Sequence, residues 1–299
     1  MICKLKSIWE LTRLEHGLMY GVGVLIGMLI AGGRILTPSQ LLGLTVLAPS
    51  RLASFGFFTA LFIQAGTFAL NDYCDLESDI ENGRLDRPLV RGDLSRQEAL
   101  VIAILATLLG IFSASFLHPL LFLLAVSSAV LGVLYDLKIK EYLAVSNLYI
   151  ALTMAIPFIF GGLLVDPGRI NQELLILALI AFLAGFGREV MKDSADLKGD
   201  ALRNVRSIAR IYGVKRATDV VIVFYSLAVL LSAIPFFTVS TSYYLNPVYA
   251  LPVLIADALF LYTALELRTT AQLEYTRLRK MTLLAIGCGL IGFISGALY

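Results

Sequence analysis

Residues 53–79 read ASFGFFTALFIQAGTFALNDYCDLESD, an apolar stretch that ends abruptly in a run of acidic side chains. The apolar part, residues 53–70, is long enough to cross a bilayer, which requires about 20 residues of helix. Asp72, Asp75 and Asp79 follow at positions i, i+3 and i+7, a spacing that places them along one face of a helix. The stretch therefore predicts a membrane helix that carries a column of carboxylates at one end.

Other apolar stretches of similar length define the class of protein. The chain has 299 residues, of which 58% are hydrophobic and only 15% charged, a composition that excludes a water-soluble domain. The stretches are too long and continuous for the strands of a membrane barrel, so helices are expected. We predict an all-α integral membrane protein with nine transmembrane helices, centred near residues 17–32, 53–70, 98–116, 119–135, 143–164, 172–190, 217–238, 247–265 and 280–298.

A second acidic motif repeats the spacing of the first. Residues 193–200 read DSADLKGD and follow the sixth predicted span, with Asp193, Asp196 and Asp200 again at i, i+3 and i+7. The two motifs lie about four spans apart, and both follow a span that runs in the same direction. This pattern predicts a single transmembrane domain over residues 1–299, built from two parallel four-helix repeats around a central cavity, with one extra helix. The repeats are expected at about residues 8–165 and 166–299.

The basic residues predict how the spans are oriented. Of the 24 Lys and Arg residues, only Arg34, Arg51 and Arg169 fall on one side of the membrane when the loops are taken alternately. Because cytoplasmic loops carry an excess of Lys and Arg, we expect a multi-pass protein of the cell membrane with its amino terminus and both acidic motifs in the cytoplasm. Lys4 and Lys6 precede an apolar stretch, as in a signal peptide. However, charged residues intervene and no cleavage pattern follows, which favours an uncleaved first helix.

Two further features of the composition narrow the function. The net charge of +2 is too small to indicate a nucleic-acid partner. Cys3, Cys74 and Cys288 are scattered, odd in number and without metal-ligand spacing, so they indicate neither a disulfide framework nor a zinc site.

The acidic columns indicate a divalent cation. Three like charges on one helical stripe repel one another unless a cation neutralises them, and oxygen-only ligands favour Mg²⁺ or Ca²⁺. Magnesium commonly binds through one or two carboxylates together with the phosphates of a substrate, which fits two half-sets of ligands. The predicted metal ligands are Asp72, Asp75, Asp79, Asp193, Asp196 and Asp200.

Basic residues near both motifs indicate that the metal-bound group is a diphosphate. Arginine holds phosphate oxygens in a two-pronged fork and lysine acts as a point charge. No glycine-rich loop with the GK[ST] pattern of nucleotide-binding sites is present. The predicted substrate-binding residues are Asn71, Arg84, Arg87, Lys138, Lys140 and Lys192.

These motifs resemble those of the UbiA superfamily of intramembrane prenyltransferases. The first signature reads Asn71-Asp72-x-x-Asp75-x-x-x-Asp79, followed by Arg87-Pro88-Leu89-x-x-Gly92. The second reads Asp193-x-x-Asp196-x-x-x-Asp200, and Tyr135-x-x-Lys138 is similar to the short Tyr and Lys segment of the family. The resemblance covers nearly the whole chain, is specific for the superfamily, and does not separate its subfamilies.

The resemblance implies a reaction. An allylic prenyl diphosphate, for example geranyl or geranylgeranyl diphosphate, binds through Mg²⁺, ionises to an allylic cation, and the cation alkylates a lipophilic acceptor. The acceptor is either an aromatic quinone precursor or an isoprenoid glycerol phosphate. Metal and basic side chains stabilise the charge on the departing diphosphate, and a helix-walled cavity keeps water from the cation. The predicted catalytic residues are Asp72, Asp75, Asp193, Asp196 and Tyr135.

Other hypotheses stay open at this point. A cation- or proton-coupled transporter would also contain repeats and intramembrane acids, although such acids usually lie near the midplane. Of these acidic residues, only Asp257 is predicted to lie near the midplane. It has either a functional role or a structural one, a hydrogen bond to another helix. His16 and Asn147 lie near the cytoplasmic ends of their spans, but neither is assigned a function. A non-catalytic lipid-binding scaffold would tolerate substitution of the aspartates.

If the two repeats face one another, the two acidic motifs share one diphosphate, and this can be tested by cross-linking. In a background without the native cysteines, Asp75→Cys and Asp196→Cys are expected to join through a reagent of about 10–15 Å, the width of a metal-bridged site between packed helices. Mass spectrometry of the cross-linked peptides is the measurement. Failure with every reagent of that length would refute a shared site.

Overall fold

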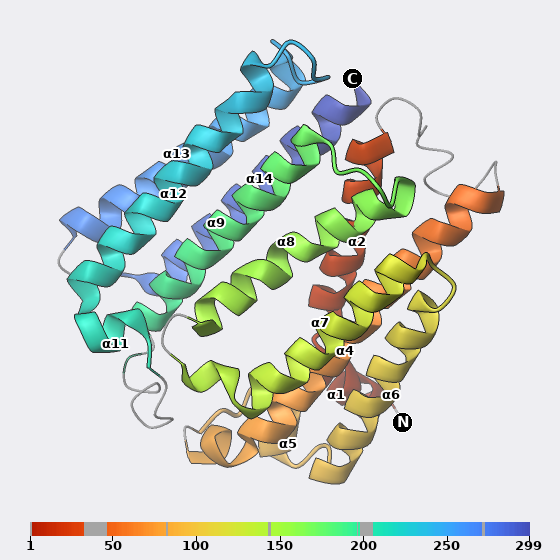
Figure 1. Cartoon of the computed structure of the whole chain (residues 1–299). Helices are drawn as coiled ribbons and strands as arrows, with labels where there is room; N and C mark the ends of the chain where they lie inside the picture. The colour runs from red at the N-terminus through yellow and green to blue at the C-terminus, as the bar shows by residue number, and fades with distance from the viewer. Residues whose placement is uncertain are drawn as a thin grey trace. The chain divides into compact units, whose positions relative to one another are not determined.

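The computed structural model describes residues 2–32, 47–81, 83–142, 145–195, 197, 206–270 and 273–299. Over these ranges the chain forms helices joined by short turns, and no strand occurs in them (Figure 1). Nine of the helices in these ranges are long and apolar enough to cross a membrane, as predicted. They are α2 (Leu14–Gly32), α4 (Leu47–Glu81), α6 (Arg96–Ala114), α7 (Pro119–Leu137), α8 (Val145–Val165), α9 (Gln172–Ala195), α12 (Val214–Phe237), α13 (Pro247–Thr269) and α14 (Tyr275–Leu298).

Shorter helices flank the spans. They are α1 (Ile2–Thr12), α5 (Pro88–Arg91), the 3₁₀ turn η2 (Ile139–Glu141) and α11 (Ile208–Tyr212).

Several span ends follow from local sequence. A capping box begins α6, where Ser95 Oγ accepts from the backbone N–H of Glu98 and the Glu98 side chain accepts from the backbone N–H of Ser95. At the start of α7, His118 Nδ1 accepts from the backbone N–H of Leu120, and Pro119 takes the first helical position. His118 is therefore the turn residue that its place before a proline predicts.

The chain divides into two compact units. Unit 1 contains α1, most of α2, α4, α5, α6, α7 and the end of α8 from Phe160. Unit 2 contains the rest of α8 together with α9, α11, α12, α13 and α14. The predicted repeats at about residues 8–165 and 166–299 stay a prediction.

Small residues bring the helices of unit 1 into close contact. A Cβ on Gly17 would lie 3.0 Å from the carbonyl oxygen of Leu61, and one on Gly21 would lie 2.5 Å from the ring of Phe57. The two glycines lie four residues apart on one face of α2, and their lack of side chains lets α2 pack closely against α4. On the other side of α4, a Cβ on Gly110 of α6 would lie 2.9 Å from the backbone nitrogen of Ile63.

Unit 2 is built around buried tyrosines. Tyr225 of α12 lies against Gly187 of α9, where a Cβ would come within 2.6 Å of its ring. Tyr249 of α13 donates its hydroxyl to the carbonyl oxygen of Ser232 at 2.6 Å. Ser232 Oγ in turn donates to Asp257 Oδ2 at 2.8 Å, so Asp257 forms the hydrogen bond between helices that was its alternative role.

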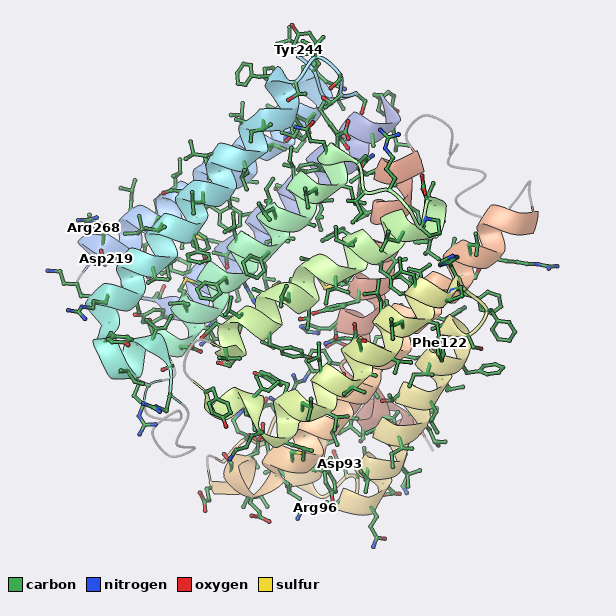
Figure 2. The ribbon with its side chains drawn as sticks, viewed as in Figure 1. Asp93, Arg96, Phe122, Asp219, Tyr244 and Arg268 are labelled. Carbon is green, nitrogen blue, oxygen red and sulfur yellow. The ribbon has the colours of Figure 1, made fainter. Side chains whose placement is uncertain are left out.

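Labelled charged and aromatic residues mark the two ends of each unit. In unit 1, Asp93 and Arg96 lie at one end and Phe122 lies toward the other (Figure 2). In unit 2, Asp219 and Arg268 lie at one end and Tyr244 at the other (Figure 2). The acidic motif of unit 1 lies at the charged end of that unit, where α4 ends.

A glycine substitution tests the packing in unit 1. A Cβ on Gly161 would lie 2.0 Å from the carbonyl oxygen of Val24, so Gly161→Ala must push α8 away from α2, and overpacking of this kind costs about 1–3 kcal/mol. We expect a lower melting temperature for the purified variant. Gly287→Ala is the matched control, because a Cβ there meets nothing within 4 Å. Equal melting temperatures for the two variants would contradict the packing.

Candidate functional site

The first acidic column lies on a helix that does not end where its apolar stretch ends. Helix α4 continues to Glu81, so Asn71, Asp72, Asp75 and Asp79 all lie on it. Asp72 and Asp79 are buried. The helical spacing expected for this motif is confirmed.

Two arginines hold one oxygen of Asp72. The Asp72 side chain is 2% exposed, and its Oδ1 accepts from Arg13 Nη2 at 2.8 Å and from Arg87 Nη1 at 3.1 Å. Arg13 joins α1 to α2 with φ 43°, a left-handed conformation that is unfavourable for a side chain of this size. Its guanidinium also lies 4.4 Å from the ring centroid of Phe68. In the described part of the chain, Asp72 Oδ2 is buried and has no hydrogen-bond partner.

The segment that follows α4 explains the pattern Arg87-Pro88-Leu89-x-x-Gly92. Arg87 is the extended N-cap of α5, as expected for a residue before proline, and Pro88 begins the helix. Gly92 ends α5 in the left-handed region with φ 77°. This short helix directs Arg87 back onto α4, where its Nε also lies 3.8 Å from Asp79 Oδ2. Arg87 therefore bridges two of the three aspartates.

The middle aspartate of the column, Asp75, is held by residues at the end of α7 and just after it. Asn71 Nδ2 donates to Asp75 Oδ2 at 3.1 Å and to Asp136 Oδ1 at 2.9 Å. Lys140 in η2 forms an ion pair with Asp75 Oδ1. Asp136 is buried, and among the described residues its Oδ2 has no hydrogen-bond partner.

The charges of this cluster do not cancel. Asp72, Asp75, Asp79 and Asp136 face Arg13, Arg87 and Lys140, so one negative charge is left over when all seven are ionised. A buried carboxylate oxygen without a partner is costly, and a cation removes that cost. The donor set is oxygen only, which suits Mg²⁺. Among the described residues no three acidic, His or Cys side chains are arranged to hold a metal by themselves.

Unit 2 repeats one element of this arrangement. Asp193 lies near the end of α9, and its Oδ2 accepts from Asn147 Nδ2 of α8 at 2.8 Å. Asn147 is 3% exposed, and over the described ranges its Oδ1 is buried without a partner. Asn147 therefore holds Asp193 much as Asn71 holds Asp75. Asp196 and Asp200 lie outside the described residues.

The structure also describes the other predicted site residues. Arg84 donates to both oxygens of Asp86 at 2.9 Å, and this hydrogen bond lowers the pKa of the Asp86 carboxyl. Lys138 is the exposed C-cap of α7, and Tyr135 is half-buried one turn earlier. In unit 2, Lys192 Nζ donates to Glu189 Oε2 at 3.1 Å. The assigned roles of these residues stay predictions.

Two residues of the cluster were absent from the sequence-based assignment. Arg13 belongs to a charged segment before the first span that has no fixed spacing to the acidic motif. Asp136 lies between Tyr135 and Lys138, and an acid at the end of an apolar span was the signal available for it.

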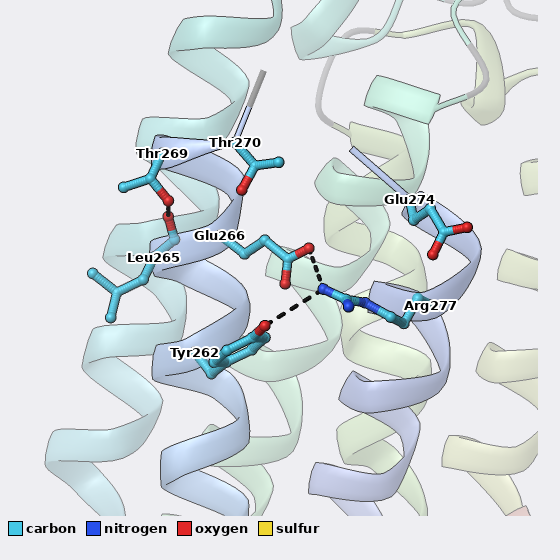
Figure 3. Close-up of a pocket in the computed structure, with 7 residues that line it drawn as sticks. All are labelled: Tyr262, Leu265, Glu266, Thr269, Thr270, Glu274 and Arg277. Carbon is cyan, nitrogen blue, oxygen red and sulfur yellow. Dashed lines mark hydrogen bonds and ion pairs between the residues drawn. The ribbon is translucent and has the colours of Figure 1, made fainter. Parts of the chain in front are cut away.

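A separate pocket of about 510 Å³ lies in unit 2, where α13 ends and α14 begins. In Figure 3, the Arg277 guanidinium points between Glu266 and the Tyr262 hydroxyl and bonds to both. Its lining contains no residue assigned to the diphosphate site. The pocket is therefore not the candidate site.

Comparison with known proteins gives a consistent family. The model of the UbiA prenyltransferase family matches residues 20–286. The chain is 46% identical over 294 residues to the digeranylgeranylglyceryl phosphate synthase of Archaeoglobus fulgidus, covering 98% of this chain and 96% of the relative. It is 30% identical over 295 residues to the protein of the same name from Pyrococcus furiosus, covering 99% and 98%.

Solved structures agree with the fold. A structure described as digeranylgeranylglyceryl phosphate synthase in membranes matches with a TM-score of 0.76 and 28% identity, covering 99% of both chains. A UbiA homologue from Aeropyrum pernix K1 matches with a TM-score of 0.73 and 17% identity, covering 94% of this chain and 96% of that one. A UbiA homologue from Archaeoglobus fulgidus bound to DMAPP and Mg²⁺ matches with a TM-score of 0.64 and 18% identity, covering 96% and 99%.

Two neighbouring arginines provide a test of the buried cluster. Arg87→Ala removes a charged partner from buried Asp72 and is expected to lower the unfolding free energy by about 1.5–3 kcal/mol. Arg84→Ala removes an exposed pair with Asp86, worth about 0–1 kcal/mol. Thermal unfolding of both purified variants is the measurement. A larger loss for Arg84→Ala would contradict the arrangement.

Proposed function

Since the chain belongs to the UbiA prenyltransferase family, we propose that it transfers a geranylgeranyl group from geranylgeranyl diphosphate to a glyceryl phosphate that already carries one such group. The chain is a membrane prenyltransferase, and the choice of donor and acceptor is the proposal. The relative at 46% identity carries the name digeranylgeranylglyceryl phosphate synthase, and that name describes a product with two geranylgeranyl groups on glyceryl phosphate. This choice favours the isoprenoid glycerol phosphate over the aromatic acceptor.

The observation that carries the proposal is the incomplete neutralisation of the unit 1 cluster. Asp72 and Asp136 each retain a buried oxygen without a partner in the described structure, beside Asp75 and Asp79. Buried carboxylate oxygens without a partner favour a substrate that arrives with metal ions. A prenyl diphosphate with Mg²⁺ has this property, and a neutral lipid does not.

The residues fit Mg²⁺, which supplies positive charge that stabilises the departing diphosphate. Asp72, Asp75 and Asp79 would hold Mg²⁺ at the first motif, and Asp193, with Asp196 and Asp200, would hold Mg²⁺ at the second. Arg87 and Lys140 are expected to contact phosphate oxygens while they stay beside their carboxylate partners, since both already reach the acidic column.

The reaction breaks the bond between the allylic carbon and the diphosphate oxygen. The bonding electrons leave with diphosphate, and the allylic carbon forms a new bond to the acceptor hydroxyl oxygen, which loses its proton. Apolar helix walls exclude water that would otherwise take the acceptor's place. Tyr135 is proposed to lie beside the allylic carbon, where a ring face stabilises positive charge.

The orientation of the protein is also part of the proposal. The distribution of Lys and Arg supports a cytoplasmic amino terminus and cytoplasmic acidic motifs. A water-soluble diphosphate head would then reach the site directly while the isoprenoid chains stay in the bilayer. A role in ion-coupled transport has no support from the relatives, whose names describe a synthase.

Product identity tests the choice of acceptor. We expect purified protein with Mg²⁺ and geranylgeranyl diphosphate to convert geranylgeranylglyceryl phosphate to the doubly alkylated ether, because an anionic acceptor with a single free hydroxyl fits the name of its relatives. Mass spectrometry of the lipid products is the measurement. An aromatic carboxylic acid offered in parallel is expected to stay unmodified. Exclusive alkylation of the aromatic ring would contradict the acceptor, and sodium-driven uptake into proteoliposomes would revive transport.

Substitution of the aspartates tests the metal site. Asp75→Asn and Asp193→Asn each remove a negative ligand, and we expect turnover to fall by about 100-fold or more, since metal assistance contributes several kcal/mol. Asp219→Asn, an exposed acid of α12, is the matched control and is expected to keep wild-type turnover. Chelation should abolish activity and Mg²⁺ should restore it. Wild-type rates in both site variants, or rescue by Zn²⁺ alone, would show that the assignment is wrong.

A further inference from the structure

Asp136 is an acid of unit 1 for which the proposed reaction gives no role. Its side chain lies at the end of α7 and is 2% exposed. Oδ1 accepts one hydrogen bond, from Asn71 at 2.9 Å, and Oδ2 is buried without a partner in the structure as described. Burying a carboxylate with one oxygen unsatisfied is costly, so its position calls for a physical reason.

The Asn71 amide provides that reason. A side-chain amide nitrogen has two N–H donors, and here one bonds to Asp75 Oδ2 and the other to Asp136 Oδ1. Asp75 is four residues from Asn71 on the same helix and turns with it. Asp136 comes from α7, so it fixes the amide from outside α4 and determines which way Asn71 faces.

The 3₁₀ turn η2, which follows α7, fixes the second oxygen of Asp75. Lys140, four residues beyond Asp136, pairs with Asp75 Oδ1. The Asp75 carboxylate is therefore held on both sides, by Lys140 directly and by Asp136 through Asn71. Hydrogen bonds to both oxygens fix the rotation of the carboxylate group, and a metal ligand needs a fixed orientation.

We propose that Asp136 is a positioning residue that acts through the Asn71 amide to orient the Asp75 carboxylate toward the metal-diphosphate complex. This inference rests on the proposed function, because it assumes that Asp75 is a metal ligand. It assigns to Asp136 an acceptor role at Oδ1 and does not require its negative charge. Removal of the acceptor and removal of the charge should therefore have different effects.

Binding of Mn²⁺ in the presence of inorganic diphosphate, followed by electron paramagnetic resonance on purified protein, separates the two. Asp136→Ala leaves Asn71 without its outer acceptor and is expected to weaken Mn²⁺ affinity by about 10-fold or more, the usual effect of losing a group that orients a ligand. Asp136→Asn keeps an oxygen acceptor, so its Mn²⁺ affinity is expected to stay within about threefold of the wild-type affinity, a smaller loss than that of Asp136→Ala. Asp219→Asn serves as the surface control.

A double-substitution cycle tests whether the effect passes through Asn71. If it does, adding Asp136→Ala to Asn71→Ala should weaken Mn²⁺ binding no further than Asn71→Ala alone. Additive losses would overturn the proposal, as would wild-type affinity in Asp136→Ala or equal losses in the Ala and Asn variants. If Asp136→Ala does not give folded protein, Asp136→Val fills the space with apolar atoms and carries the same expectation.

Asp75→Asn distinguishes this inference from the proposed function. If Asp75→Asn weakens Mn²⁺ binding while Asp136→Ala does not, the positioning role is wrong and the metal site stands. If Asp75→Asn keeps wild-type affinity, the metal site itself is wrong, and the positioning role is overturned with it.

Discussion

The acidic side chains of unit 1 lie at the end of the long helix α4, and the ion pairs between Asp72 and two arginines hold this end in place. Arg13 and Arg87 reach the same oxygen from either side of Asp72 in the sequence, one from the turn before α2 and one from the cap of α5. Removing one partner of such a buried group leaves an uncompensated charge, which is far more costly than losing a surface pair. The turn at Arg13, the short helix α5 and the end of α7 all serve to deliver partners to α4.

The proposed chemistry follows from the carboxylate oxygens that these partners do not bind. Arg13, Arg87 and Lys140 supply less positive charge than the four carboxylates require, and two buried oxygens have no partner among the described residues. A cluster of this kind is stable enough to fold and still gains from a bound cation. Membership of the UbiA prenyltransferase family agrees with the proposal that a cation binds here together with a diphosphate. Asn71 and Asn147 give each unit an amide that holds a motif aspartate.

The sequence was a good guide to the spans and a partial guide to the site. All nine predicted spans are confirmed over the described residues, because length and hydrophobicity alone decide whether a helix can cross a bilayer. The column of Asp72, Asp75 and Asp79 was also predictable, since helical spacing is a local property. Arg13 and Asp136 were not, because their contacts with α4 span 59 and 65 positions of sequence. No periodicity encodes such a distance, and only packing brings these residues together.

We propose that the acidic cluster binds a metal ion and a diphosphate together. The most direct measurement is the melting temperature of purified protein with Mg²⁺ alone, with inorganic diphosphate alone, and with both. A ligand that binds only the folded state raises stability by RT ln(1 + [L]/Kd), about 2.7 kcal/mol at 100 times Kd. The account predicts little change with either component alone and a clear rise with both, lost in Asp75→Asn. An equal rise with diphosphate in the absence of any divalent metal would contradict it.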